Sequence, residues 1–173
     1  GNSLATITVG NVVERIPQVP IFDVNIFEDL RKSLELSGYA MNQNTFYFPY
    51  DWRLNLDITK DLLQQKIEAV KSQTGSAKVN IVAHSMGGLL VKDYFHEFGT
   101  NSIDKLIFVG TPHLGAPKTA KVLLDGDQFG IPWLEDDRIQ EIAENSPAVY
   151  ELLPSQKYFD VFQGYIKPWS LFG

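Results

Sequence analysis

Residues 78–98 constrain the fold of this chain more than any other stretch, because a strand pattern changes directly into a helix pattern there. The stretch opens with a short β-branched apolar run at 79–82, and toward its end apolar residues recur at the spacing of one helical face. Ser85 lies between the two patterns, with Ala83 two residues before it and Gly87 two residues after it. This arrangement is the nucleophile-elbow pattern, with alanine in place of the first glycine.

A strand that turns directly into a helix forces the residue at the turn into a strained backbone conformation and exposes its side chain. Small residues are needed on either side, because bulky ones would collide across so tight a turn. We therefore predict that Ser85 is a nucleophile and that the Met86 backbone amide, at a helix N-terminus, stabilises an oxyanion. The alternative is an ordinary strand–turn–helix with an incidental serine.

Composition narrows the classes of function. The 173 residues suffice for one domain with its own core, and no apolar run approaches the ~20 residues needed to span a bilayer. A net charge of −6 without a basic cluster excludes nucleic-acid binding and favours solubility. Cysteine is absent, which removes disulfides, thiolate metal sites and cysteine nucleophiles. We expect no metal and no cofactor. The N-terminus is interpreted as a mature or truncated start, and the sequence does not indicate in which compartment the protein works.

Strand and helix patterns alternate up to residue 110. Helices are expected at about 25–37 and 57–72, and strands at 46–50 and 105–110 in addition to the strand of the elbow. Strands that are apolar on both faces and alternate with amphipathic helices predict an α/β fold. We expect a partial α/β-hydrolase fold, with a parallel sheet flanked by helices on both sides.

The ends of the first helix and the residues before it carry weaker signals. Asn25 is predicted to cap that helix and Gly38 to end it. Residues 12–20 contain two prolines and are predicted to be irregular, whereas residues 4–13 alternate weakly and suit a short strand or an extended arm.

Residues 111–173 differ from the rest, because they are rich in Gly, Pro and aromatic residues and show no clear strand. Helices near 138–143 and 147–153 are expected there, the second with Ser146 as its cap. The prediction is one domain in three parts. These are an extended arm or incomplete strand region (1–24), the hydrolase core with the elbow (25–118), and a lid-like or cap-like segment (119–173).

An activated serine needs a histidine base and an orienting carboxylate, which follow the serine in an α/β-hydrolase with the acid first. The chain contains three histidines. His84 must point away from Ser85, and we expect a buried, hydrogen-bonded elbow residue. His96 lies near the far end of the helix, well over ~10 Å from the catalytic edge of the sheet. His113 follows the next strand and is expected to line the site or to serve structure.

The acidic residue of the triad cannot be assigned from the sequence either. Asp125 and Asp127 are interpreted as a solvated turn, Asp136 and Asp137 as a helix start, and Asp160 has no histidine after it. No complete triad and no second oxyanion donor can be assigned. We therefore expect an interior piece of a larger hydrolase that is inactive by itself.

Four blocks resemble the lecithin:cholesterol acyltransferase family of α/β-hydrolases, with its lipase-like and phospholipase relatives, and occur in that family's order. They are Phe48-Pro49-Tyr50-Asp51-Trp52-Arg53, Val82-Ala83-His84-Ser85-Met86-Gly87-Gly88, Gly110-Thr111-Pro112-His113-Leu114-Gly115-Ala116-Pro117 and Pro147-Ala148-Val149-Tyr150-Glu151-Leu152-Leu153-Pro154. The elbow alone is common to many lipases and esterases. The Tyr-Asp-Trp-Arg and Tyr-Glu-Leu-Leu-Pro blocks are more specific.

The resemblance implies an acyl-ester hydrolase or acyltransferase with Ser85 as nucleophile and the Met86 amide in the oxyanion hole. It also implies that 114–134 lies near the acyl site. Family members carry the triad aspartate in a Gly-Asp-Gly segment and the histidine beyond it, both after the Leu-Leu-Pro block. They also carry a Pro-Gly oxyanion loop upstream. None of these occurs in the 173 residues.

The candidate substrate-lining residues are Trp52, His113 and Leu114. Two interpretations of Trp52 stay open: it lines the lipid entrance, or it packs while Asp51 and Arg53 pin the loop as an ion pair. Two interpretations also stay open for four large apolar residues in the C-terminal part of the chain: they form a lipid-facing lid, or they cover apolar sheet surface. These residues are Phe129, Trp133, Leu134 and Trp169.

The predicted function is that of a lipase, phospholipase or transacylase with a serine nucleophile. The alternative is a non-catalytic binding or structural module with the hydrolase fold, and a thioesterase or amidase also fits, because the elbow serves acyl transfer in general. The expected partners are a lipid or other acyl-ester substrate, a membrane surface in transient contact and the remainder of the parent chain, without nucleic acid.

Overall fold

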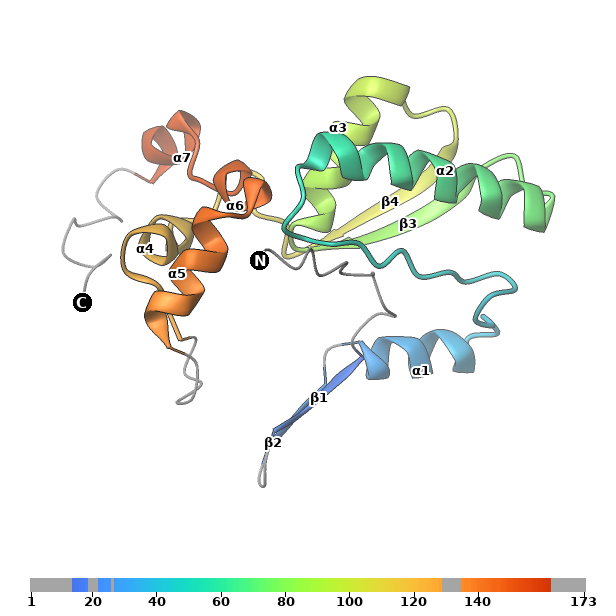
Figure 1. Cartoon of the computed structure of the whole chain (residues 1–173). Coiled ribbons are helices and arrows are strands. Elements are labelled where there is room, and N and C mark those ends of the chain that lie inside the picture. The colour runs from blue at the N-terminus through green and yellow to red at the C-terminus, as the bar shows by residue number, and fades with distance from the viewer. Residues whose placement is uncertain (1–13, 19–21, 26, 129–134, 163–173) are drawn as a thin grey trace, which may run out of the picture.

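The computed structural model describes residues 14–18, 22–25, 27–128 and 135–162 (Figure 1). In chain order the elements are β1 (Arg15–Gln18), β2 (Phe22–Asn25), α1 (Glu28–Leu36), α2 (Leu56–Thr74), β3 (Val79–His84), α3 (Gly87–Phe98), β4 (Ile103–Val109), α4 (Lys118–Asp125), α5 (Asp136–Glu144), α6 (Pro147–Glu151) and α7 (Gln156–Val161).

The parallel pair β3 and β4 is the centre of the fold. Helix α3 joins the two strands, since parallel strands need a crossover connection, and Val82 faces Ile107 across the pair. Helices α2 and α3 pack against each other and against β3 (Figure 1). The expected α/β class is confirmed at this level: a small parallel sheet with helices.

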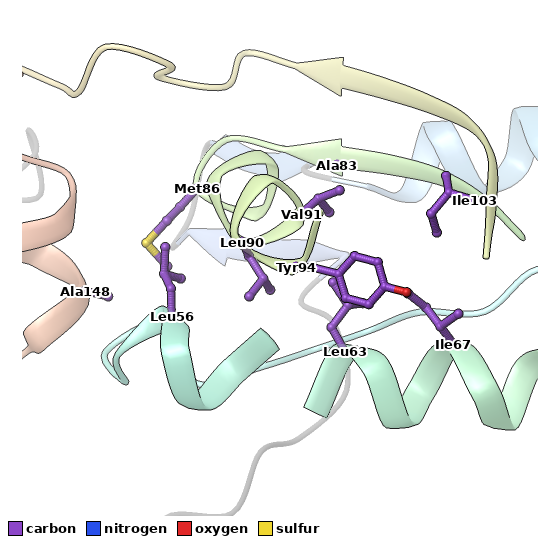
Figure 2. Close-up of a cluster of buried hydrophobic side chains, with 10 residues drawn as sticks. All are labelled: Leu56, Leu63, Ile67, Ala83, Met86, Leu90, Val91, Tyr94, Ile103 and Ala148. Atoms are coloured by element: carbon purple, nitrogen blue, oxygen red, sulfur yellow. The ribbon is translucent and has the colours of Figure 1, made fainter. Parts of the chain in front are cut away.

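The main hydrophobic core lies between α2, α3 and the sheet (Figure 2). Tyr94 and Leu90 of α3 are each only 1% exposed, and Ala148 of α6 is fully buried, so α6 is tied to the same core. The buried members of the cluster are Leu56, Leu63, Ile67, Ala83, Met86, Leu90, Val91, Tyr94, Ile103 and Ala148.

The opposite face of the sheet is open among the described residues. Val82, Ile107 and Val109 are 50%, 55% and 45% exposed, because side chains alternate along a strand and these point away from the helices. Phe27, just before α1, reaches this face through an edge contact with the His84 ring. The expectation of helices on both faces is therefore not met in the described ranges.

The first helix begins later than expected. Asn25 belongs to β2, where it pairs with Arg15 of the antiparallel strand β1, so the predicted Asn25 cap is wrong. Helix α1 follows Phe27 and has no side-chain cap. Its predicted end at Gly38 is confirmed, because Gly38 has φ +89° and the Tyr39 amide donates to the Leu34 carbonyl.

The β1–β2 hairpin also corrects the prediction that residues 12–20 are irregular, as far as 15–18 are concerned. Pro17 is compatible with a two-stranded ladder, because each strand of such a pair has an edge that needs no amide donor. The weak strand or arm predicted at 4–13 lies outside the described residues.

The expected strand at 46–50 is not formed. In the described part of the chain no backbone group of this segment is hydrogen-bonded to a strand, and Pro49 lacks an amide donor. The alternating pattern has a different cause: the Phe48 and Tyr50 rings stack with centroids 5.9 Å apart and both pack against the core.

After β4 the described residues contain helices and loops without a strand, as predicted. Helices α5 and α6 match the expected positions, whereas α4 and α7 carry no signal that the sequence reasoning used. Ser146 precedes α6 but does not cap it, because its hydroxyl donates to the Ile142 carbonyl (2.6 Å). The four expected lid residues 129, 133, 134 and 169 lie outside the described ranges.

No helix in the described part of the chain combines the length and the apolar character needed to cross a membrane.

Candidate active site

Ser85 lies at the turn between β3 and α3, as the sequence pattern predicts. Its φ is +52°, a left-handed value that only Asn42 shares among the described non-glycine residues. The Ser85 amide donates to the Val109 carbonyl (2.8 Å), and the Ser85 carbonyl accepts from the Gly88 amide (3.0 Å). A left-handed φ costs a side-chain-bearing residue about 1–2 kcal/mol. The strand β4 and the first turn of α3 therefore hold the serine in a strained conformation.

Gly88 marks the tightest contact at this turn. A β-carbon there would collide with the Thr111 side chain and would lie 2.8 Å from Cδ1 of Phe108. At Gly87 the same addition would meet the Tyr50 hydroxyl at 3.8 Å, an ordinary contact. The steric requirement for a small residue thus falls on Gly88, one position later than the elbow pattern indicates.

Met86 presents only its backbone to the turn. Its side chain is buried beside Leu56 and Ala148 (Figure 2), and it is the N-cap residue of α3. Among the described residues no carbonyl accepts its amide hydrogen. A free amide at a helix N-terminus suits a developing negative charge. The role of Met86 as an oxyanion donor stays a prediction.

The loop after the 46–50 segment is pinned by an ion pair. Arg53 donates from Nε and a terminal nitrogen to the two Asp51 carboxylate oxygens (2.8 and 2.6 Å), and the Arg53 amide donates to the same group. The guanidinium lowers the pKa of Asp51 below its ordinary value. Trp52 is 50% exposed, so this side chain does not pack into the core.

The loop at 110–117, which follows β4, is hydrogen-bonded directly to the residues at the end of α6 and just after it. The Ala116 amide donates to the Leu152 carbonyl (2.7 Å), and the Ser155 amide donates to the Leu114 carbonyl (2.9 Å). Gly115 has φ +92° and contacts the backbone of Leu153, where no side chain would fit. The loop at 110–117 is therefore fixed against the end of α6.

The same C-terminal block also contacts the start of α2. Both Glu151 carboxylate oxygens accept from the Leu56 amide (3.3 and 3.2 Å), and the Ala148 amide donates to the Arg53 carbonyl (3.4 Å). The four sequence blocks, which are far apart in the chain, thus converge around the turn that carries Ser85.

The structure places no histidine as a base for Ser85. In the described ranges Ser85 Oγ makes no hydrogen bond to a histidine or a carboxylate. His84 is exposed, with its ring edge against Phe27, so the expected buried, hydrogen-bonded residue is wrong. His96 is exposed in the last turn of α3, as expected. His113 is exposed and packs against Phe108 with centroids 4.8 Å apart.

One of the acidic residues differs from its prediction. Asp127 is not in a solvated turn, because its side chain is 13% exposed and lies 3.2 Å from the Lys118 amine and 3.7 Å from the Lys121 amine. Asp136 and Asp137 do begin helix α5. Over the described ranges no group of His, Cys, Asp and Glu side chains is arranged to hold a metal ion.

Sequence reasoning does not identify Tyr50 and Thr111 as residues that touch the elbow. Thr111 fills the space beside Gly88, and the Tyr50 hydroxyl lies 3.8 Å from where a β-carbon on Gly87 would be, so segments approach that no spacing rule connects. The available signal is the Gly-Gly pair after Met86, since adjacent glycines often permit close approach of other segments.

Comparison with known proteins adds independent information. The family model described as lecithin:cholesterol acyltransferase matches residues 13–169. A phospholipase A(1) of Arabidopsis thaliana is 28% identical over 159 residues, which cover 85% of this chain and 35% of that protein. The lysosomal phospholipase A and acyltransferase of Rattus norvegicus is 29% identical over 74% of this chain and 32% of its own length.

The phosphatidylcholine-sterol acyltransferase of Rattus norvegicus is 28% identical over 70% of this chain and 30% of its own length. The chain spans about a third of the length of these three relatives.

Proposed function

The chain belongs to the lecithin:cholesterol acyltransferase family, and on this premise we propose that its parent protein is a serine acyl-ester hydrolase or acyltransferase acting on lipid esters. The family resemblance of the four sequence blocks is confirmed. The observation that carries the proposal is the left-handed φ of Ser85 at a strand–helix turn. Strain of this kind persists where the surrounding structure holds a functional side chain in place.

In the proposed reaction Ser85 Oγ attacks the carbonyl carbon of the ester. The O–C bond forms as the carbonyl π electrons move to oxygen, and the hydroxyl proton passes to a general base. The intermediate collapses by breaking the bond to the alcohol, which leaves with that proton. Water or a second alcohol then attacks the acyl-serine in the same way, which releases an acid or a new ester and regenerates Ser85.

The Met86 amide supports this reaction by donating to the oxyanion of each tetrahedral intermediate. Two features favour the assignment: the amide has no acceptor among the described residues, and it lies at the N-terminal end of α3. The core around its side chain keeps the amide in position without an adjustment during the reaction.

The base and its carboxylate are proposed to come from the rest of the parent chain. His84 contacts Phe27, His113 contacts Phe108, and His96 lies at the far end of α3. None of these placements gives Ser85 Oγ a hydrogen-bonded partner within the described ranges. On this proposal the 173 residues alone do not turn over substrate.

Lipid esters are the proposed substrates because the relatives are named for phospholipase and sterol acyltransferase activities. Trp52 is exposed on a rigid loop, so it is proposed to contact the acyl chain or a membrane surface in transient contact. His113 and Leu114 follow β4 next to the elbow and are proposed to line the substrate path.

The test uses the full-length parent protein with phosphatidylcholine vesicles, with and without a sterol as acyl acceptor. We expect release of fatty acid, transfer to the sterol, or both, and loss of these products in Ser85→Ala. Ser37→Ala is the matched control, because the Ser37 hydroxyl bonds only within α1 and its C-terminal turn. Vesicle binding without any product would favour a non-catalytic module instead.

A further inference from the structure

Helix α2 carries a second apolar stripe besides the one that enters the core. Ile58 and Leu62 lie one helical turn apart on a face that is not buried, and they are 56% and 44% exposed. Trp52 and Leu54, in the loop that leads into the helix, are also exposed. Single exposed apolar residues are ordinary on a protein surface, whereas four large ones within residues 52–62 indicate an interaction site. We call these four side chains the apolar patch.

The patch begins beside the turn between β3 and α3. At one end of the loop, Tyr50 Oη lies 3.8 Å from the position that a β-carbon on Gly87 would occupy. At the other end, Leu56 packs in the buried cluster beside Met86 (Figure 2). The exposed side chains of the loop lie between these two contacts. The patch therefore starts next to the turn that carries the proposed nucleophile and continues along α2.

The loop holds its exposed side chains in a fixed arrangement. Arg53, between Trp52 and Leu54, donates to both carboxylate oxygens of Asp51 (2.8 and 2.6 Å). The Arg53 carbonyl accepts from the Ala148 amide of α6 (3.4 Å), and the Leu54 amide donates to the Asp51 carbonyl (3.2 Å). Little conformational entropy is then lost when the patch binds a partner, because the backbone is already ordered.

The charges of the same stretch favour a partner without net negative charge. In residues 51–62, all of which the structure describes, both basic side chains are paired: Arg53 with Asp51, and Lys60 with Asp57 at 2.6 Å. The Lys60 side chain is also largely buried, whereas the Asp57 side chain is 70% exposed. The stretch therefore offers no available cation to an anionic surface, which basic side chains would be needed to attract.

A lipid surface is the partner that fits both the position and the charge of the patch. An ester carried by a bilayer has to reach Ser85 Oγ, and the patch borders that turn. Tryptophan and aliphatic side chains are the groups that enter the boundary between headgroups and acyl chains. Zwitterionic lipid has no net charge, so the exposed acidic side chain beside the patch does not oppose its binding.

We propose that the apolar patch docks the protein on the surface of a zwitterionic lipid bilayer, with the Ser85 turn at the lipid side. The inference rests on the proposed function and goes beyond it by naming the docking surface, its orientation and the class of lipid. Binding through this patch is driven by burial of apolar area, so it differs in its salt dependence from binding through basic residues.

The test uses the full-length parent protein as the Ser85→Ala variant, so that the vesicles are not consumed, and measures binding by flotation with phosphatidylcholine vesicles. We expect binding that added sodium chloride does not weaken and that partial replacement by phosphatidylserine does not strengthen. Trp52→Ser and Ile58→Ser should each weaken binding about tenfold, the effect of one large apolar side chain. Leu36→Ser is the matched control, because it removes an exposed leucine of α1 outside the patch, and its binding should be unchanged.

Two results with vesicles would overturn the proposal. One is binding that requires phosphatidylserine and is released by salt, since basic residues elsewhere would then carry it. The other is equal binding of Trp52→Ser, Ile58→Ser and Leu36→Ser, which would exclude the patch as the docking surface. The absence of any binding overturns it as well.

Measurements without vesicles identify the other possible occupants. A dimer that Ile58→Ser dissociates in sedimentation velocity would show that a second copy covers the patch. A loss of stability of the size expected for a core residue would show that another segment of the parent chain covers it. Either result overturns the lipid assignment. Hydrolysis of a soluble ester by the protein with Ser85 intact needs no vesicle, so it tests the proposed function separately from the docking.

Discussion

The Thr111 hydroxyl occupies the space that a β-carbon on Gly88 would need, so the loop after β4 and the first turn of α3 touch without a side chain between them. Oγ1 of Thr111 is fully buried and has no hydrogen-bond partner among the described residues. The Thr111 hydroxyl therefore makes no hydrogen bond that could hold the turn. The turn that carries Ser85 is held at this point by close packing alone.

Gly88→Ala is expected to lower the free energy of unfolding by about 1–3 kcal/mol, the usual cost of overpacking. Both Thr111 and Phe108 would have to move to admit the methyl group. Adding Thr111→Ala should recover part of the loss, and urea unfolding of the single and double variants measures the coupling. Additive losses would contradict the contact.

Thr111→Val is expected to leave stability unchanged or to raise it. The substitution replaces a buried hydroxyl without a partner by a methyl group of similar size, which removes a desolvation cost. Thermal unfolding of the full-length protein tests this. A loss of more than ~1 kcal/mol, the usual net value of one hydrogen bond, would show that the hydroxyl has a partner.

Ser85→Gly is expected to be more stable than Ser85→Ala by about 1 kcal/mol, because glycine adopts a positive φ without the penalty that a β-carbon brings. Both variants lack the hydroxyl, so the comparison isolates backbone strain. Urea unfolding at neutral pH provides the measurement. Equal stability, or a less stable glycine variant, would mean that the turn is not strained in solution.

The Glu151 carboxyl, which accepts from the Leu56 amide at the start of α2, should make the stability of the fold depend on pH. Burial raises the pKa of its carboxyl above the ordinary 4.5, so the stability linked to its protonated form is present below that value and lost as pH rises. Glu151→Gln still offers an oxygen to the Leu56 amide and should match or exceed the wild type at pH 7, with the difference shrinking toward pH 4. Glu151→Ala should cost about 1 kcal/mol, because the Leu56 amide loses its acceptor.

The Asp51–Arg53 ion pair should give the opposite dependence of stability on pH. The hydrogen bond from Arg53 lowers the pKa of Asp51 below its ordinary 3.8, so the pair stabilises the fold at pH values above 3.8. This contribution is lost as the pH falls through the pKa that Asp51 has in the folded state. Asp51→Asn should therefore cost about 1 kcal/mol at pH 7, in the range of a partly exposed ion pair. The cost should shrink at pH 3. A difference that does not vary with pH would contradict the ion pair.

The features that sequence predicts well here have local causes. Helix α2 combines a regular apolar face with an asparagine cap whose side chain accepts from the Asp57 amide, and the structure places it within two residues of the expected bounds. The elbow is also local, since β-branched residues, a serine and a Gly-Gly pair follow one another in a few positions.

The features that sequence misses depend on partners far along the chain. Asn25 has the chemistry of a cap, but pairing with Arg15 draws it into a strand. Residues 46–50 have the alternation of a strand, but no strand pairs with them in the described ranges. The approach of Tyr50 to Gly87 likewise follows from the packing of separate segments, which hydrophobic periodicity does not encode.

The nucleophile assignment of Ser85 is tested most directly by treating the full-length parent protein with a fluorophosphonate and mapping the modified peptide by mass spectrometry. We predict a single phosphonylated site, on Ser85, and no labelling in Ser85→Ala or after heat denaturation, because only the folded elbow activates the hydroxyl. Absence of label on the active, folded protein, or labelling that persists in Ser85→Ala, would contradict a serine acyl-transfer mechanism at this turn.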